Sequence, residues 1–142
     1  MRKRTLAREL ALQLMYQLDL RGPEILEEVD EYLRGQSEDP EVISFAAALV
    51  RGTWERKALI DAKIEEIARN WQLHRMAVID RNILRLATYE LLFLDDIPPL
   101  VTINEAIEIA KKYSTKNSGP FVNGILDNIR LHGAPSAKQR GK

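Results

Sequence analysis

The chain has 142 residues, with 21 basic and 21 acidic side chains, two histidines and no cysteine. The missing cysteines exclude a disulfide framework, a zinc ribbon, an iron–sulfur site and a thiol nucleophile, and they suit a reducing compartment. No apolar run approaches the roughly 18 to 20 residues that cross a membrane, and no signal-peptide pattern follows the basic start. We therefore expect a cytoplasmic protein without a membrane partner.

The zero net charge hides a strong asymmetry along the chain. Residues 1–8 carry four bases and no acid, residues 9–110 carry ten bases and twenty acids, and residues 111–142 carry seven bases and one acid. Basic ends favour an anionic partner, and an acidic middle favours a basic one. The alternative is that the basic ends are only solvated.

The predicted elements are all helical. Apolar spacing and turn residues predict helices over 3–20, 24–34, 40–69, 76–94, 103–113 and 120–131. The fourth is apolar on nearly every side, so it should be central and buried. Thr102 and Glu105 have capping-box spacing, which predicts that they open the fifth helix.

This pattern predicts an all-α fold, a bundle of six to seven helices. The length suits one domain over residues 1–132, with an N-terminal half of about 1–70 and a C-terminal half of about 71–132. The basic tail at 133–142 is predicted to be disordered.

Tyr16 falls almost opposite the apolar stripe of the first predicted helix. Four bases lie toward the start of the same helix: Arg2, Lys3, Arg4 and Arg8. An exposed tyrosine can stack on a nucleobase while neighbouring cations hold phosphates. The alternative is an ordinary exposed aromatic, which is common on protein surfaces.

The loop before the last predicted helix has features of a phosphate site. A helix N-terminus leaves backbone N–H groups unpaired, and Gly119 would let a ligand approach the backbone closely. The polar residues here are Lys116, Asn117, Ser118 and Asn123. A loop and a helix end suit unstacked bases of single-stranded RNA better than duplex DNA.

Each of these features has a structural alternative. The nearby lysines at 111 and 112 can pair with Glu108, and Ser118 can be a helix cap. Phe121 lies at the edge of the core stripe, which favours core packing over base stacking.

Patterns of catalytic and metal sites are missing from the sequence. It has no Gly-rich phosphate loop and no G-x-S-x-G turn, and neither His74 nor His132 has metal-site spacing. Glu90 falls on the apolar side of the central helix, where a carboxylate must be paired or protonated. An ion pair between Glu90 and an arginine is favoured over a catalytic role. We therefore expect that the protein is not an enzyme and that it binds no metal and no cofactor.

Three stretches of the sequence resemble the NusB family of bacterial transcription antitermination factors: ARELALQLMYQ at 7–17, IDRNILRLATYELLFLDDIPPLVTINEAIEIAKKYST at 79–115, and FVNGILDNI at 121–129. The order and spacing of YEL, DIP, INEAIE, AKKY and FVNG are distinctive. The resemblance implies two three-helix bundles packed across each other and no catalytic activity. It also implies binding of single-stranded boxA RNA in ribosomal RNA leader transcripts, together with the small-subunit ribosomal protein NusE, to promote read-through by RNA polymerase.

The resemblance also assigns residues. It places RNA contacts at Arg2, Lys3, Arg4, Arg8, Tyr16, Asn117, Ser118 and Phe121. It places NusE contacts near Asp80, Arg81 and Glu90. Asn117 stands where the family usually has an acid, and Pro120 stands where it often has a lysine. The first change removes a charge that would repel phosphate, and the second removes a cation.

Two rival functions stay open. Some family members form homodimers, so the chain could be a homodimeric helical interaction protein whose RNA-binding face is masked. A NusB-like domain also precedes some RNA methyltransferase domains, but this chain is too short to include one.

Overall fold

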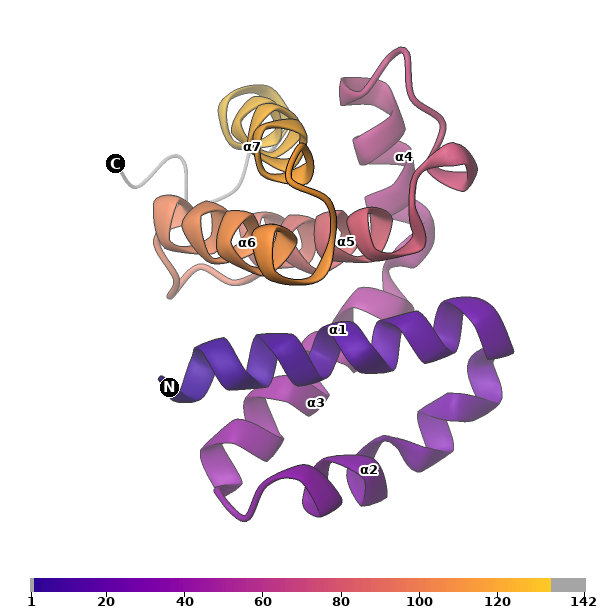
Figure 1. Cartoon of the computed structure of the whole chain (residues 1–142), viewed down its shortest axis with the longest axis vertical. Helices are drawn as coiled ribbons and strands as arrows, with labels where there is room; N and C mark the ends of the chain where they lie inside the picture. Colours follow the sequence, from indigo (N-terminus) through magenta and orange to yellow (C-terminus); the bar gives the residue numbers. More distant parts are fainter. Residues whose placement is uncertain (1, 134–142) are drawn as a thin grey trace. The chain divides into compact units, whose positions relative to one another are not determined.

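The computed structural model describes residues 2–133, and within that range it has seven α-helices and no strand (Figure 1). The predicted all-α class is confirmed. The chain divides into two compact units, of which the first ends at Glu55 and the second begins at Arg56. Except for residue 133, the tail predicted to be disordered lies outside the described residues.

The division of the chain falls earlier than the sequence suggested. The pattern over 40–69 predicts one long helical stretch, in which Gly52 and Thr53 allow a kink or close packing, and we placed the boundary between the halves after it. The structure has two helices there, because the backbone turns at Arg56, with φ −105° and ψ 19°. A single turn residue leaves little trace in the apolar periodicity, so the sequence did not reveal this break.

The first unit contains three α-helices and one 3₁₀ segment. These are α1 (Lys3–Arg21), the 3₁₀ segment (Pro23–Glu28), α2 (Val29–Gln36) and α3 (Pro40–Glu55). Helix α1 packs mainly on α3, and five residues of its predicted apolar stripe are buried: Ala7, Leu10, Ala11, Leu14 and Leu18. Leu6, the sixth, is only partly buried. The turn after α1 requires Gly22, whose φ of 107° is strained for side-chain-bearing residues.

Helix α3 begins with a capping arrangement around Asp39. The backbone N–H of Glu41 donates to Asp39 Oδ1 at 2.9 Å, and the N–H of Asp39 donates to Ser37 Oγ at 3.1 Å. Pro40 occupies the first helical position, where its missing N–H costs nothing. These contacts fix the start of α3.

The second unit is built around one buried helix. Its elements are α4 (Lys57–Ile67), a 3₁₀ turn (Leu73–Arg75), α5 (Val78–Phe93), α6 (Pro99–Tyr113), α7 (Ser118–Asn128) and a π-helical turn (Ile129–Gly133). Helix α5 contacts α4, α6 and α7, and its residues from Asn82 to Leu91 are all buried. The predicted central position of this helix is confirmed.

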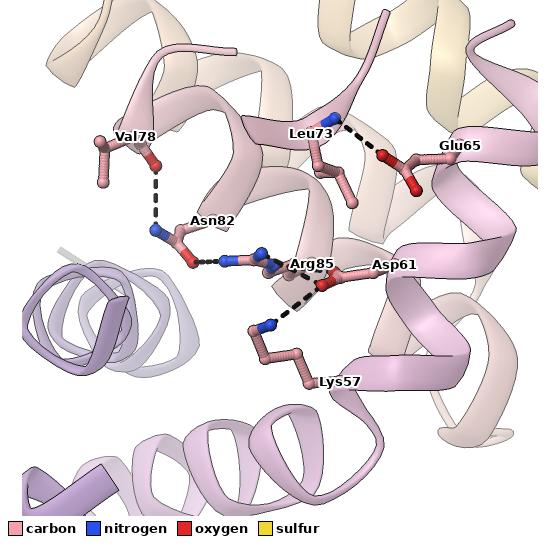
Figure 2. A network of polar contacts seen from close by, with 7 residues as sticks. All are labelled: Lys57, Asp61, Glu65, Leu73, Val78, Asn82 and Arg85. Carbon is pink, nitrogen blue, oxygen red and sulfur yellow. Dashed lines mark hydrogen bonds and ion pairs between the residues drawn. The ribbon is translucent and has the colours of Figure 1, made fainter. Parts of the chain in front are cut away.

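Arg85 of α5 anchors α4 through Asp61 (Figure 2). Its Nε lies 2.8 Å from Asp61 Oδ1 and its Nη2 lies 3.1 Å from Oδ2, while Nη1 donates to Asn82 Oδ1 at 3.1 Å. Lys57 adds a second cation, 3.2 Å from Asp61 Oδ2. A buried guanidinium therefore meets a carboxylate in the two-point geometry that makes such pairs strong.

The predicted capping box at Thr102 is wrong. Helix α6 begins at Pro99, so Thr102 lies inside the helix, and its hydroxyl donates to Glu90 Oε1 at 2.8 Å. Proline is favoured in a first helical turn, and this preference moves the start of α6 ahead of the capping signal. The buried Glu90 thus receives a hydrogen bond from a neighbouring helix, and its predicted arginine pair stays a prediction.

Within residues 2–133, no helix is long and apolar enough to cross a membrane. The same residues contain no group of three or more histidine or acidic side chains that could hold a metal ion.

Candidate nucleic-acid interface

Phe45 of α3 organises the basic residues at the start of α1. The guanidinium carbon of Arg4 lies 4.5 Å from the centre of the Phe45 ring, and that of Arg8 lies 5.5 Å from it. Arg8 is buried, whereas Arg4 remains exposed. The aromatic face attracts both cations and presents Arg4 at the surface. Sequence reasoning missed Phe45, because nothing in the local sequence indicates that a phenylalanine of α3 meets arginines of α1.

Lys3 is held by carboxylates from the start of α3. Its Nζ lies 3.2 Å from Asp39 Oδ2 and 3.5 Å from Glu41 Oε1. The hydrogen bond to Asp39 is the main reason that the pKa of Lys3 is raised, with attraction to both acids adding to it. The pKa of Asp39 is lowered, chiefly by the Glu41 backbone N–H and then by Lys3. An anionic ligand of Lys3 would therefore compete with these two acids.

An open groove of about 500 Å³ runs along this part of the first unit. Its walls are formed by Lys3, Arg4, Pro40, Glu41, Ser44, Phe45 and Ala48. Tyr16, on the same α1, is 36 % exposed, so part of its ring is open to a stacking partner. The exposed position predicted for Tyr16 is confirmed, while its RNA contact stays a prediction.

The loop before α7 divides into an exposed part and a buried part. Lys116 and Asn117 are exposed, whereas Ser118 and Gly119 are buried. The Ser118 hydroxyl points toward Asp80 Oδ2, at 3.1 Å. Gly119 lies against Ile107 and Lys111 of α6, where an added Cβ would make ordinary contacts at 3.6 and 3.7 Å. The exposed pair is therefore open to a ligand at the surface of the loop.

Trp71 and Phe121 form the aromatic wall of a pocket in the second unit. Their ring centres are 5.5 Å apart, with the planes at 74°, and Trp71 is 53 % exposed. The pocket holds about 290 Å³ and is lined by Trp71, Arg75, Met76, Ala77, Asp80, Thr115, Asn117, Ser118 and Phe121. Phe121 therefore has a structural aromatic partner as well as access to a cavity.

Sequence reasoning missed Trp71 and Arg75. The sequence did contain a signal for Trp71, because NWQLHR is a polar break between helices. A tryptophan in such a break is expected at the surface, where it can meet a partner. The carboxylate of Glu65 accepts a hydrogen bond from the backbone N–H of Leu73 at 3.1 Å, which fixes the turn that follows Trp71 (Figure 2).

The residues predicted to contact a protein partner differ in exposure. Asp80 and Glu90 are buried, and Arg81 is partly exposed. Asn123, predicted to contact RNA, lies exposed on α7. Of the three partner residues, Arg81 alone offers appreciable side-chain surface, and all three assignments stay predictions.

The chemistry of the pocket suits a flat heteroaromatic group next to an anion. Trp71 and Phe121 supply apolar ring surface, Arg75 supplies a cation, and Asn117 supplies an amide that can both donate and accept. Together these are the groups that bind unstacked bases and their phosphates.

Comparison with known proteins gives the same family as the sequence resemblance. The NusB family profile matches residues 5–130. The transcription antitermination protein NusB of Desulfitobacterium hafniense is 48 % identical over 132 residues, covering 89 % of this chain and 86 % of that protein. The NusB of Bdellovibrio bacteriovorus is 49 % identical over 124 residues, covering 87 % of this chain and 91 % of that protein.

Comparison with solved structures leads to the same family. A crystal form of T. maritima NusB matches with a TM-score of 0.87 and 42 % identity, covering 99 % of this chain and 98 % of that one. A crystal structure of the antitermination factors NusB and NusE in complex with double-stranded RNA matches with a TM-score of 0.79 and 32 % identity, covering 92 % and 98 %.

Proposed function

Because the chain belongs to the NusB family of transcription antitermination proteins, we propose that it binds single-stranded boxA-type RNA together with NusE. In this proposal the RNA is part of a ribosomal RNA leader transcript, and the complex helps RNA polymerase to read through terminators. This activity belongs in the cytoplasm, where bacterial transcripts are made.

The pocket lined by Trp71 and Phe121 is the observation that carries the RNA assignment. Its volume of about 290 Å³ and its aromatic wall fit one base that has left its stack. Asn117 offers an amide to the edge of that base, and Arg75 offers a cation to the neighbouring phosphate. Base–aromatic stacking typically contributes about 1–3 kcal/mol per base.

The first unit supplies a second, separate set of contacts. Arg2 and Arg4 are exposed, Lys3 can exchange its carboxylates for phosphate, and Tyr16 offers a partly open ring. Because phosphate contacts are largely electrostatic, they should give affinity without much sequence preference. Sequence preference then depends on the pocket, on Tyr16 and on NusE.

NusE is the proposed protein partner. The related NusB in the solved complex is bound with NusE and double-stranded RNA. The acidic stretch of this chain, residues 9–110, complements a basic ribosomal protein and would speed their association.

Fluorescence anisotropy tests this proposal. A labelled single-stranded boxA-type RNA is titrated with the protein, with and without NusE, at two salt concentrations. The competitors are a scrambled strand of equal length and the same sequence as a duplex. We expect preference for the single-stranded boxA-type RNA, tighter binding with NusE, and weaker binding at higher salt.

Two variants of α1 sharpen the test. Tyr16→Ala should weaken binding at both salt concentrations, and Tyr16→Phe should retain most of it, because the stacking ring is kept. Leu20→Ala is the matched control, since Leu20 is another exposed apolar residue of α1. Equal affinity for all strands, or no binding even with NusE, would overturn the proposal.

The homodimeric alternative makes a different prediction. A dimer that masks the RNA-binding face should show concentration-dependent sedimentation, and its RNA affinity should fall as the protein concentration rises. A single monomeric species across the titration range would exclude this masking.

A further inference from the structure

We propose that Asp80 is a positioning residue for RNA binding, which acts by tying both ends of the loop from Ser114 to Asn117 to the start of α5. The expected effect on RNA affinity rests on the proposed function, but the hydrogen bonds that tie the loop to Asp80 can be tested without RNA. It gives Asp80 a different role from the NusE contact that the family resemblance suggested.

Each oxygen of the Asp80 carboxylate receives a hydroxyl from one end of this loop. Ser114 Oγ donates to Oδ1 at 2.6 Å, and Ser118 Oγ donates to Oδ2 at 3.1 Å. The two serines are 34 and 38 residues away from Asp80 along the chain. One side chain of α5 therefore holds the first residue of the loop and the first residue of α7.

Thr115 completes the arrangement from within the loop. Its backbone N–H donates to Ser118 Oγ at 3.3 Å, and its own hydroxyl lies 3.1 Å from the same oxygen. Ser118 has one hydroxyl hydrogen, which faces both Asp80 Oδ2 at 3.1 Å and Ser114 Oγ at 2.9 Å, while its oxygen accepts from the Thr115 N–H. The result is a connected chain of hydrogen bonds that links Thr115, Ser118 and Ser114 to Asp80.

Burial makes this chain effective. Asp80 is 9 % exposed and Ser118 is 3 % exposed, so water competes little for the hydrogen bond between them, while the bonds of Ser114 and Thr115 are partly buried. Hydrogen bonds to an ionised group in such surroundings are stronger than those between neutral groups. A carboxylate is also the right group here, because it accepts two hydroxyls at once and donates to neither.

The consequence for function is a loop that is shaped before RNA arrives. Lys116 and Asn117 lie exposed between the two tied ends, and Asp80, Asn117 and Phe121 line the same pocket. Ordering a loop during binding costs free energy, and a loop that is already ordered avoids that cost. The two hydroxyls also shield the Asp80 charge from the phosphates of a bound strand.

The tie is tested first without RNA, by amide hydrogen exchange of Thr115 and Ser118. Both amides are bonded within the loop, to Ser118 Oγ and to the Thr115 carbonyl oxygen. We expect Asp80→Ala to speed the exchange of both, while Asp80→Asn, which keeps one acceptor oxygen, should have a smaller effect. Unchanged exchange in Asp80→Ala would overturn the proposal whatever the RNA measurement shows.

The second readout is the affinity for a labelled single-stranded boxA-type RNA, at a temperature where every variant is folded. Asp80→Ala should weaken binding about tenfold because the loop must then be ordered on binding. Asp61→Asn is the matched control, since it weakens a hydrogen-bonded carboxylate of the same unit outside the pocket. This control should lower the melting temperature while changing affinity less than about twofold.

A double-mutant cycle separates positioning from direct contact. If Asp80 acts through Ser118, the Ser118→Ala change alone should weaken binding, and adding Asp80→Ala should then weaken it much less than in the wild type. Fully additive losses would instead mean that Asp80 touches RNA itself, which overturns the proposal. If the wild type binds no RNA, the proposed function fails, and the exchange rates still decide whether Asp80 orders the loop.

Discussion

Arg85 and Asp61 face each other as a two-point fork between α5 and α4, with N–O distances of 2.8 and 3.1 Å (Figure 2). The Arg85 side chain is 6 % exposed and that of Asp61 is 18 % exposed. A guanidinium in such a place depends on its partner, because a buried charge without one is costly. This pair therefore joins the first helix of the second unit to its central helix.

Removing Asp61 should destabilise the second unit. We expect Asp61→Ala to lower the free energy of unfolding by about 2–3 kcal/mol, because Arg85 stays buried without its carboxylate. Urea unfolding checks this in a Trp54→Phe background, where Trp71 reports on the second unit alone. Glu108→Ala is the control, since the exposed Glu108–Lys111 pair of the same unit should contribute less than about 1 kcal/mol. Equal decreases in the free energy of unfolding in the two variants would contradict a special role for the buried Arg85–Asp61 pair.

Trp71 should matter for RNA and little for folding. Trp71→Ala should weaken RNA binding by about 1–3 kcal/mol, which is the usual contribution of a stacked base. Because the ring is half exposed, the melting temperature should change little. Quenching of Trp71 fluorescence by RNA, again in the Trp54→Phe background, measures the contact directly. Leu59→Ala, an exposed apolar change in the same unit, should leave RNA binding unchanged.

The charge at position 117 should set part of the RNA affinity. Asn117→Asp should weaken binding about fivefold at low salt, since a unit charge a few ångströms from a phosphate costs roughly 1 kcal/mol in water. The difference should shrink as salt screens the repulsion. Asn117→Ala separates the two effects, because it removes the amide without adding charge. A loss that does not depend on salt would mean that the amide itself makes the contact.

The start of α3 should be sensitive to acid. The pKa of Asp39 lies below its usual value of 3.8, because the Glu41 N–H and Lys3 favour its ionised form. Its contribution to stability is thus present above the unfolded pKa, and it is lost as the pH falls through the folded pKa.

Melting temperatures measured from neutral pH downward check this expectation. The melting temperature of the wild type should exceed that of Asp39→Asn near neutral pH, and this difference should vanish in acid. Lys3, whose folded pKa is raised above 10.5, contributes stability below its unfolded pKa and loses it as the pH rises through the folded pKa. A difference between wild type and Asp39→Asn that stays constant into strong acid would show that the charge of Asp39 does not stabilise the start of α3.

Most of what the sequence predicted correctly depends on neighbours within a few turns. Apolar periodicity predicted the all-α class, the buried central helix α5 and the exposed position of Tyr16. The motif order from YEL to FVNG predicted the family, which the comparisons confirm. These features are local because a helix sets the direction of each side chain by its own geometry.

Tertiary structure alone decided which distant side chains meet. Asp80 with Ser118, Trp71 with Phe121, and Arg4 with Phe45 each join separate helices or loops. Thr102 shows the same limit, since its spacing predicts a cap, while its hydroxyl instead serves Glu90 of another helix. Helical periodicity fixes the face on which a residue lies, but the partner of that face depends on how helices pack, and packing is a property of the whole unit.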